Sequence, residues 1–172
     1  MFNFTGKTVL ITGASYGLGA SFAEGFAAAG ANLVLTARST DLLEATGESC
    51  HKLGAKVLCI TGDVSKEDDV KRVVAADIKE FGGIDTLVNN AGISDVLGIG
   101  AERFPTETFD NIMAVDLRGA FLYMREVGLH MLMKKSGNIV NICSIMGSGA
   151  NEMNIIAYTA AKGALRNITQ QL

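Results

Sequence analysis

The sequence is poor in cysteine, histidine and proline. Its 172 residues include three cysteines, two histidines and one proline. Cys50, Cys59 and Cys143 are odd in number and lack the spacing of a metal site, so we expect reduced, mostly buried thiols. His51 and His130 lie far apart within helical patterns, which favours surface or packing roles over catalysis. These absences argue against a disulfide framework and against a cysteine or histidine metal centre.

Other absences bear on location and partners. No apolar run approaches the roughly 20 residues that span a bilayer, and residues 1–7 lack a signal-peptide pattern. We therefore expect a cytoplasmic protein without a membrane partner. The formal net charge is -3, and the basic residues are scattered rather than grouped. We therefore expect no nucleic-acid partner.

The composition is typical of one soluble globular domain, with 48% hydrophobic and 19% charged residues. Pro105 is the only proline, and no internal repeat, low-complexity tract or linker divides the chain. We predict a single domain over residues 1–172.

Short apolar runs alternate with longer segments that have helical spacing of apolar residues. The runs lack strict alternation, which favours parallel strands covered on both faces; they span 7–12, 32–37, 56–61, 85–89 and 138–143. The predicted helices span 17–29, 40–53, 66–81, roughly 106–134 and 157–172. This repetition predicts an α/β fold with a doubly wound parallel sheet between two helical layers. Ser65 and Asp68 predict a capping box for the third helix.

A glycine-rich turn follows the first predicted strand and opens the first helix. Its spacing is TGxxxGxG, which is wider than GxGxxG. In this context backbone N–H groups and the helix amino terminus can hold a diphosphate, although a plain strand-to-helix turn is the alternative. The candidate cofactor residues are Thr12, Gly13, Ser15, Tyr16, Gly17, Leu18 and Gly19.

The end of the second strand bears on the choice between nicotinamide cofactors. An acidic side chain there binds the ribose 2′-hydroxyl of NAD, whereas a basic one accepts the 2′-phosphate of NADP. Ala37 provides no carboxylate, and Arg38 can form paired hydrogen bonds to a phosphate. NADP(H) is therefore favoured and NAD(H) is the alternative. A solvated Arg38 engaged by Asp41 or Glu44 stays open.

Two further groups lie at carboxyl ends of strands, where open α/β sheets bind ligands. Asp63 and Val64 follow the third strand, and Asn90, Ala91 and Gly92 follow the fourth. We expect both groups to lie beside the cofactor. They could also act structurally, since Asp forms turns and Asn amides tie loops together.

The last group indicates the reaction. Tyr158 and Lys162 are one helical turn apart, so the ammonium can stabilise a phenolate and allow the phenol to exchange a proton. Ser144, after the fifth strand, can hydrogen-bond the substrate oxygen while hydride passes to or from a nicotinamide. Taken alone, the Tyr-x-x-x-Lys pair could also be an exposed helix contact.

Taken together, these motifs resemble those of the classical short-chain dehydrogenases/reductases. The resemblance rests on TGASYGLG at 12–19, Asp63-Val64, NNAG at 89–92, Ser144 and YTAAK at 158–162. It implies a Rossmann fold, dimers or tetramers, and NAD(P)-dependent interconversion of a small secondary alcohol and a ketone, as in carbonyl and 3-oxoacyl reductases. It also implies that Tyr158 is the acid/base, that Lys162 is its cation and a ribose contact, and that Ser144 polarises the carbonyl.

One residue departs from the family pattern. Asp116 stands in the long helix where these enzymes commonly have asparagine. The asparagine acts largely through its backbone carbonyl, so Asp116 could preserve that role, and its charge could stabilise the Lys162 cation. Pairing with Arg118 or with solvent is the alternative.

Length is the second departure. The resemblance implies a sixth strand, a substrate-covering segment and a closing strand after Leu172. We therefore expect a fragment that lacks the last strands, with the neighbourhood of the fifth strand exposed. Residues 93–100 and 148–156 would form only part of a substrate pocket. A dinucleotide-binding module without turnover is the alternative to an enzyme.

Overall fold

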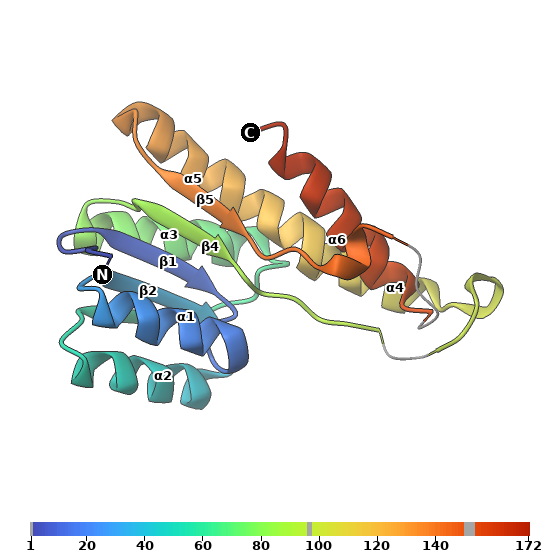
Figure 1. The fold of residues 1–172 in the computed structure, drawn as a ribbon, viewed down its shortest axis with the longest axis horizontal. Coiled ribbons are helices and arrows are strands. Elements are labelled where there is room, and N and C mark those ends of the chain that lie inside the picture. The colour runs from blue at the N-terminus through green and yellow to red at the C-terminus, as the bar shows by residue number, and fades with distance from the viewer. Residues whose placement is uncertain (1, 96–97, 150–153) are drawn as a thin grey trace.

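Strands and helices alternate along the chain in a computed structural model, which describes residues 2–95, 98–149 and 154–172 (Figure 1). The strands are β1 (Thr8–Thr12), β2 (Asn32–Ala37), β3 (Val57–Thr61), β4 (Thr86–Asn89) and β5 (Asn138–Asn141). The α-helices are α1 (Gly17–Ala28), α2 (Thr40–Lys52), α3 (Glu67–Phe81), α4 (Thr106–Ile112), α5 (Ala120–Lys134) and α6 (Ile156–Thr169). Three short helical segments are η1 (Ala101–Arg103), η2 (Met113–Gly119) and η3 (Ile145–Gly147).

The strands form one parallel sheet in the order β3-β2-β1-β4-β5. The chain moves outward from β1 to β3 and then returns to place β4 on the other side of β1. This reversal is the point where open α/β sheets form a crevice beyond the carboxyl ends of their strands. Ile11 marks the junction, since it pairs with Leu35 of β2 and Val88 of β4.

Each face of the sheet has its own apolar core. Val9 and Ile11 pack with apolar residues of α1 and α2, whereas Leu10 packs with those of α3 and α5. Figure 1 shows α1 and α2 on one side of the sheet and α5 on the other. Because successive strand side chains point to opposite faces, the continuous apolar runs fill both cores. The predicted doubly wound fold in three layers is confirmed.

The predicted elements are confirmed apart from shifts at their ends and one change of helix type. The single helix predicted over 106–134 consists of α4, the π-helical segment η2 and α5, which follow one another without a break. A π-helical turn is wider than an α-helical turn, and apolar periodicity does not distinguish the two. Asp116 lies within η2.

The predicted capping box of the third helix is wrong. α3 begins at Glu67, and the preceding residue Lys66 makes no side-chain capping hydrogen bond. The Ser65 hydroxyl instead donates a hydrogen bond to Asp63 Oδ1 over 2.7 Å. Ser and Asp side chains commonly bond to nearby loop groups, and here that competing turn prevails.

β5 is an edge strand with one open face. Ile139 packs into the core beside α5, whereas Val140 is 43% exposed on the opposite face. This agrees with the exposure expected around the fifth strand. No helix in the described ranges is long and apolar enough to cross a bilayer.

All three cysteines are free, as expected. Cys50 is buried, and Cys59 and Cys143 are half-buried. Burial raises the pKa of both the Cys50 and the Cys59 thiol to about 11, so these two groups are poor nucleophiles at neutral pH.

Asp77, on α3, makes stability depend on pH. Its side chain is fully buried, and neither carboxyl oxygen has a hydrogen-bond partner in the described part of the chain. Burial raises the pKa of this carboxyl to about 7, with Lys134 opposing the rise. Because the pKa of Asp77 is higher in the folded state than in the unfolded state, protonation of this carboxyl favours folding. This contribution to the free energy of unfolding is fully present below about pH 4 and is lost as the pH rises to about 7.

Asp77→Asn is therefore expected to stabilise the fold at pH 8 by up to about 4 kcal/mol and to change it little at pH 4. Denaturant unfolding at both pH values measures this difference. Asp68→Asn, at an exposed position on the same helix, is the control. Equal gains at both pH values would show that Asp77 does not titrate as proposed.

Candidate active site

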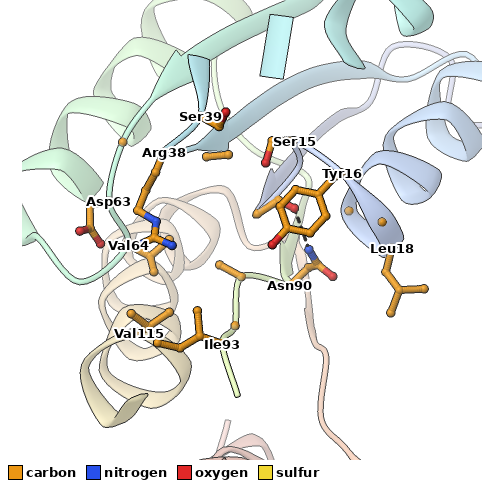
Figure 2. Close-up of a pocket in the computed structure, with 17 residues that line it drawn as sticks. Ser15, Tyr16, Leu18, Arg38, Ser39, Asp63, Val64, Asn90, Ile93 and Val115 are labelled. Carbon is orange, nitrogen blue, oxygen red and sulfur yellow. Dashed lines mark hydrogen bonds between the residues drawn. The ribbon is translucent and has the colours of Figure 1, made fainter. Parts of the chain in front are cut away.

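A cleft of about 310 Å³ lies at the carboxyl ends of β1, β2, β3 and β4 (Figure 2). Four separate loops therefore contribute to one surface. Of the predicted cofactor residues, those that line it are Gly13, Ser15, Tyr16, Gly17, Leu18, Gly19, Arg38, Asp63, Val64, Asn90, Ala91 and Gly92. Ala37, Ser39, Gly62, Ile93 and Val115 complete the lining.

The glycine turn is closely packed. Gly13 has φ +64°, and a Cβ on it would lie 2.8 Å from the Ala91 Cα. A Cβ on Gly19 would overlap the Gly13 carbonyl oxygen. The Asn90 amide donates hydrogen bonds to the carbonyls of Thr12 and Gly13, at 2.9 and 3.1 Å. Both glycines therefore allow backbone segments to approach where side chains would separate them.

Thr12 lies beneath the cleft rather than on its lining. Its side chain is buried, and its Oγ1 accepts hydrogen bonds from the backbone N–H groups of Asn90 and Ala91, each at 3.0 Å. Together with the Asn90 amide, these bonds join the turn after β1 to the loop after β4. Thr12 supports the shape of the cleft from below.

The amino terminus of α1 opens toward the cleft. Tyr16 precedes the helix and makes no side-chain capping hydrogen bond, and the first turn of the helix contains no acidic residue. The first N–H groups of a helix have no partner within the helix, and they confer a partial positive charge. The turn and the open helix end together fit a diphosphate group.

Arg38 extends into the cleft. Figure 2 shows its guanidinium lying toward Val64, on the same side as Asp63. Within the described ranges it forms no ion pair with Asp41 or Glu44. The guanidinium is thus available to an anionic ligand.

Asp63 forms a turn and also lines the cleft. Its Oδ1 accepts hydrogen bonds from the Ser65 N–H and hydroxyl, at 2.9 and 2.7 Å, as expected of a turn former. Its backbone N–H donates to Asp69 Oδ2 over 3.0 Å, which fixes the loop after β3.

Tyr158 and Lys162 lie on α6, with the lysine buried and the tyrosine half-buried. Lys162 Nζ lies 5.6 Å from the Tyr158 ring centroid and donates a hydrogen bond to the Ile142 carbonyl over 3.1 Å. A Cβ on Gly92 would lie 3.2 Å from the same Nζ. The ammonium group therefore reaches the backbone that lines the cleft.

Asp116 pairs with Lys162. Its Oδ2 lies 3.2 Å from Lys162 Nζ, and its Oδ1 accepts a hydrogen bond from the Ile93 N–H over 2.7 Å. Burial raises the pKa of the Asp116 carboxyl, while Lys162 and the Ile93 N–H oppose that rise. Arg118 instead donates a hydrogen bond to the Ser65 carbonyl and pairs with Glu67. The structure therefore shows Asp116 in contact with Lys162 rather than paired with Arg118.

Ser144 lies between β5 and η3, and its Oγ accepts a hydrogen bond from the Met146 N–H over 3.1 Å. A Cβ on Gly147 would lie 2.7 Å from the Gly163 nitrogen, so this turn packs directly on the backbone of α6. The turn that contains Ser144 is thereby held against the helix that contains Tyr158. Among the described residues these two side chains make no direct hydrogen bond.

Sequence reasoning missed part of the site. Val115 lines the cleft, and its position beside Asp116 was the available signal, whereas Ile93, which also lines the cleft, belongs to the predicted substrate-pocket segment 93–100. Asp95 contacts α6, and no local pattern indicates that contact. Of the predicted substrate-pocket segments 93–100 and 148–156, residues 96–97 and 150–153 lie outside the described residues.

The chain matches the short chain dehydrogenase family over residues 7–172. It belongs to that family. The match includes the glycine turn, the NNAG loop, Ser144 and the Tyr158–Lys162 pair, and it extends over nearly the whole chain.

Similar proteins include one curated relative and two solved structures. The chain is 40% identical over 168 residues to 2-(R)-hydroxypropyl-CoM dehydrogenase of Xanthobacter autotrophicus, covering 96% of this chain and 67% of the relative. A metagenomic short-chain oxidoreductase in complex with NADP has a TM-score of 0.92 and 30% identity, covering 98% of this chain and 75% of that chain. NAD+-bound xylitol dehydrogenase has a TM-score of 0.93 and 30% identity, and the match covers 98% of this chain and 64% of that chain. The chain spans 63% to 67% of the length of the first curated relatives that it matches.

Proposed function

We propose that this chain binds NADP(H) in the cleft and interconverts a small secondary alcohol and a ketone at Ser144, Tyr158 and Lys162. The observation that supports this most strongly is the junction at Gly92. The backbone there lines the cleft, and it lies against Lys162 Nζ and Asp116 Oδ2. A group bound along the cleft is therefore brought close to the pair formed by Asp116 of η2 and Lys162 of α6.

Different residues of the cleft would bind different parts of the cofactor. The glycine turn and the open end of α1 take the diphosphate, Asp63 and Val64 flank the adenine side, and 90–93 flank the nicotinamide side. When bound, a reduced nicotinamide supplies the hydride that a carbonyl carbon accepts.

The protein residues move the proton. In reduction, the Tyr158 hydroxyl gives its proton to the substrate oxygen, and in oxidation the phenolate takes a proton from the alcohol. Ser144 donates a hydrogen bond to that oxygen, since its Oγ accepts its other bond from Met146. The Lys162 cation, 5.6 Å from the Tyr158 ring, stabilises the negative charge left on the phenol oxygen.

Asp116 and the Ile142 carbonyl hold Lys162 in place beneath Gly92. A buried cation needs such partners, because burial without them costs several kcal/mol, on the order of the desolvation penalty of one ion. Asp116 thus acts on the reaction by fixing the ammonium group near Tyr158.

NADP(H) rather than NAD(H) is proposed because Arg38 extends into the cleft and Ala37 provides no carboxylate. Arg38→Asp is expected to remove the bonds to the 2′-phosphate and to repel it. The ratio of the NADPH and NADH dissociation constants should shift toward NADH by about 100-fold, since bonds between charged groups contribute about 1.5–3 kcal/mol.

Nicotinamide fluorescence titration with each reduced cofactor measures both dissociation constants. Lys79→Asp makes the same change in net charge at an exposed position on α3, outside the cleft, and should leave the ratio unchanged. An unchanged ratio in Arg38→Asp would reject the assignment of the 2′-phosphate to Arg38.

A further inference from the structure

We propose that Asp95 is a positioning residue for Tyr158, because it caps α6 from the loop that follows the cleft lining. This inference rests on the proposed function of Tyr158. Neither the sequence motifs nor the lining of the cleft include Asp95.

The contact is bidentate. Asp95 Oδ2 accepts a hydrogen bond from the Ala157 N–H and Oδ1 accepts one from the Tyr158 N–H, each at 3.1 Å. Ile156 is the first residue of α6, so these donors are the second and third residues of the helix. They are the N–H groups that a capping side chain usually satisfies. Asp95 therefore acts as the cap of α6, although it precedes the helix by about 60 residues.

The residue directly before α6 does not cap it through its side chain. Ile155 precedes it and cannot accept a hydrogen bond through its side chain. Asp95 is 3% exposed and Ala157 is fully buried, so water cannot readily replace the carboxylate. Its negative charge also interacts favourably with the positive end of the helix. Removal of the Asp95 carboxylate would leave the N–H groups of Ala157 and Tyr158 without these hydrogen bonds.

The loop that contains Asp95 is fixed at Ile93 as well as at Asp95. The Ile93 N–H donates to Asp116 Oδ1 over 2.7 Å, and Asp116 in turn contacts Lys162. Residues 90–93 line the cleft immediately before this point. One loop therefore contacts α6 directly at Tyr158 through Asp95, and indirectly at Lys162 through Asp116.

These two contacts lie one helical turn apart on α6. Together they fix both the position of the helix along its axis and its rotation relative to the cleft. Asp95 binds the backbone N–H of Tyr158 itself, the residue that carries the reacting hydroxyl. A displacement of about 1 Å at a reacting group can reduce the rate by about 100-fold, so loss of the cap should slow the reaction rather than weaken cofactor binding.

The test compares Asp95→Ala, which removes both acceptors, with Asp95→Asn, which keeps one acceptor oxygen but loses the charge. Asp68→Asn is the matched control, because it removes a carboxylate from the first turn of α3 at an exposed position. For each protein, NMR hydrogen exchange at the Ala157 and Tyr158 amides, the NADPH dissociation constant, and kcat and KM are measured. The substrates are 2,3-butanedione, cyclohexanone and a 3-oxoacyl thioester.

In Asp95→Ala the two amides are expected to exchange about tenfold faster or more, and kcat to fall by at least about tenfold. The NADPH dissociation constant should stay within about twofold of wild type. Asp95→Asn should lie between Asp95→Ala and wild type, and Asp68→Asn should match wild type. If Asp95→Ala does not fold, Asp95→Asn gives the same readouts at smaller amplitude.

Faster amide exchange with an unchanged kcat would overturn the proposal, because Asp95 would then only stabilise the helix. A parallel loss of NADPH affinity would also overturn it. The exchange measurement needs no turnover. Absence of turnover in the wild-type chain would therefore contradict the proposed function, whereas unchanged exchange in Asp95→Ala would contradict the cap.

Discussion

Tyr158→Phe is expected to reduce the rate of NADPH-dependent ketone reduction by about 10³-fold or more while leaving NADPH affinity within about twofold of wild type. General acid catalysis contributes about 10² to 10⁴ in rate, and phenylalanine has no proton to give. Tyr158 does not line the cleft, so cofactor affinity should change little. Lys162 keeps its partners Asp116 and the Ile142 carbonyl in the variant, so the local fold should persist.

Single-turnover absorbance at 340 nm with a saturating ketone measures the rate, and fluorescence titration measures NADPH affinity. Tyr16→Phe is the matched control, because Tyr16 lines the cleft and is 72% exposed, yet it has no proposed role in proton transfer. It should retain most of the wild-type rate. Activity in Tyr158→Phe comparable to that of Tyr16→Phe would exclude Tyr158 as the acid.

Gly19→Ala is expected to weaken NADPH binding by at least about 100-fold, which corresponds to about 2.7 kcal/mol. The added Cβ would overlap the Gly13 carbonyl oxygen and lie 2.7 Å from Asn90 Nδ2. Neither neighbour is a flexible side-chain end that can move freely, since the Asn90 amide is bonded to the Thr12 and Gly13 carbonyls. The turn must therefore move away from α1, and the N–H groups that face the diphosphate separate.

Gly25→Ala tests whether the effect is specific to that contact. Gly25 lies in the same helix, and a Cβ on it would have no atom within 4 Å. Alanine there should raise the unfolding free energy by about 0.5–1 kcal/mol and leave NADPH affinity unchanged. Calorimetric titration of both variants with NADPH measures the difference. Equal affinities in the two variants would contradict the proposed role of the turn.

The fold and the cleft were predictable because their signals are local. Apolar runs such as 32–37 give strands, and the spacing of Gly13, Gly17 and Gly19 indicates a turn that opens a helix. The carboxyl ends of parallel strands share one edge, so the sequence alone places Asp63 and Asn90 beside that turn.

The contacts around α6 could not be predicted in the same way. The Asp95 cap joins residues 62 positions apart, and the pairing of Asp116 with Lys162 requires η2 and α6 to pack together. Neither follows from periodicity. The capping box failed for a different reason, because Asp63 and Ser65 form a local turn that competes with the helix cap.

A crystal structure of the chain with NADPH is the most direct measurement of the central claim. We expect the dinucleotide in the cleft, with its 2′-phosphate at Arg38, its diphosphate at the Gly13 turn and the Tyr158 hydroxyl facing the nicotinamide ring. A cleft without NADPH at a saturating concentration, or a Tyr158 hydroxyl that faces away from the ring, would contradict it.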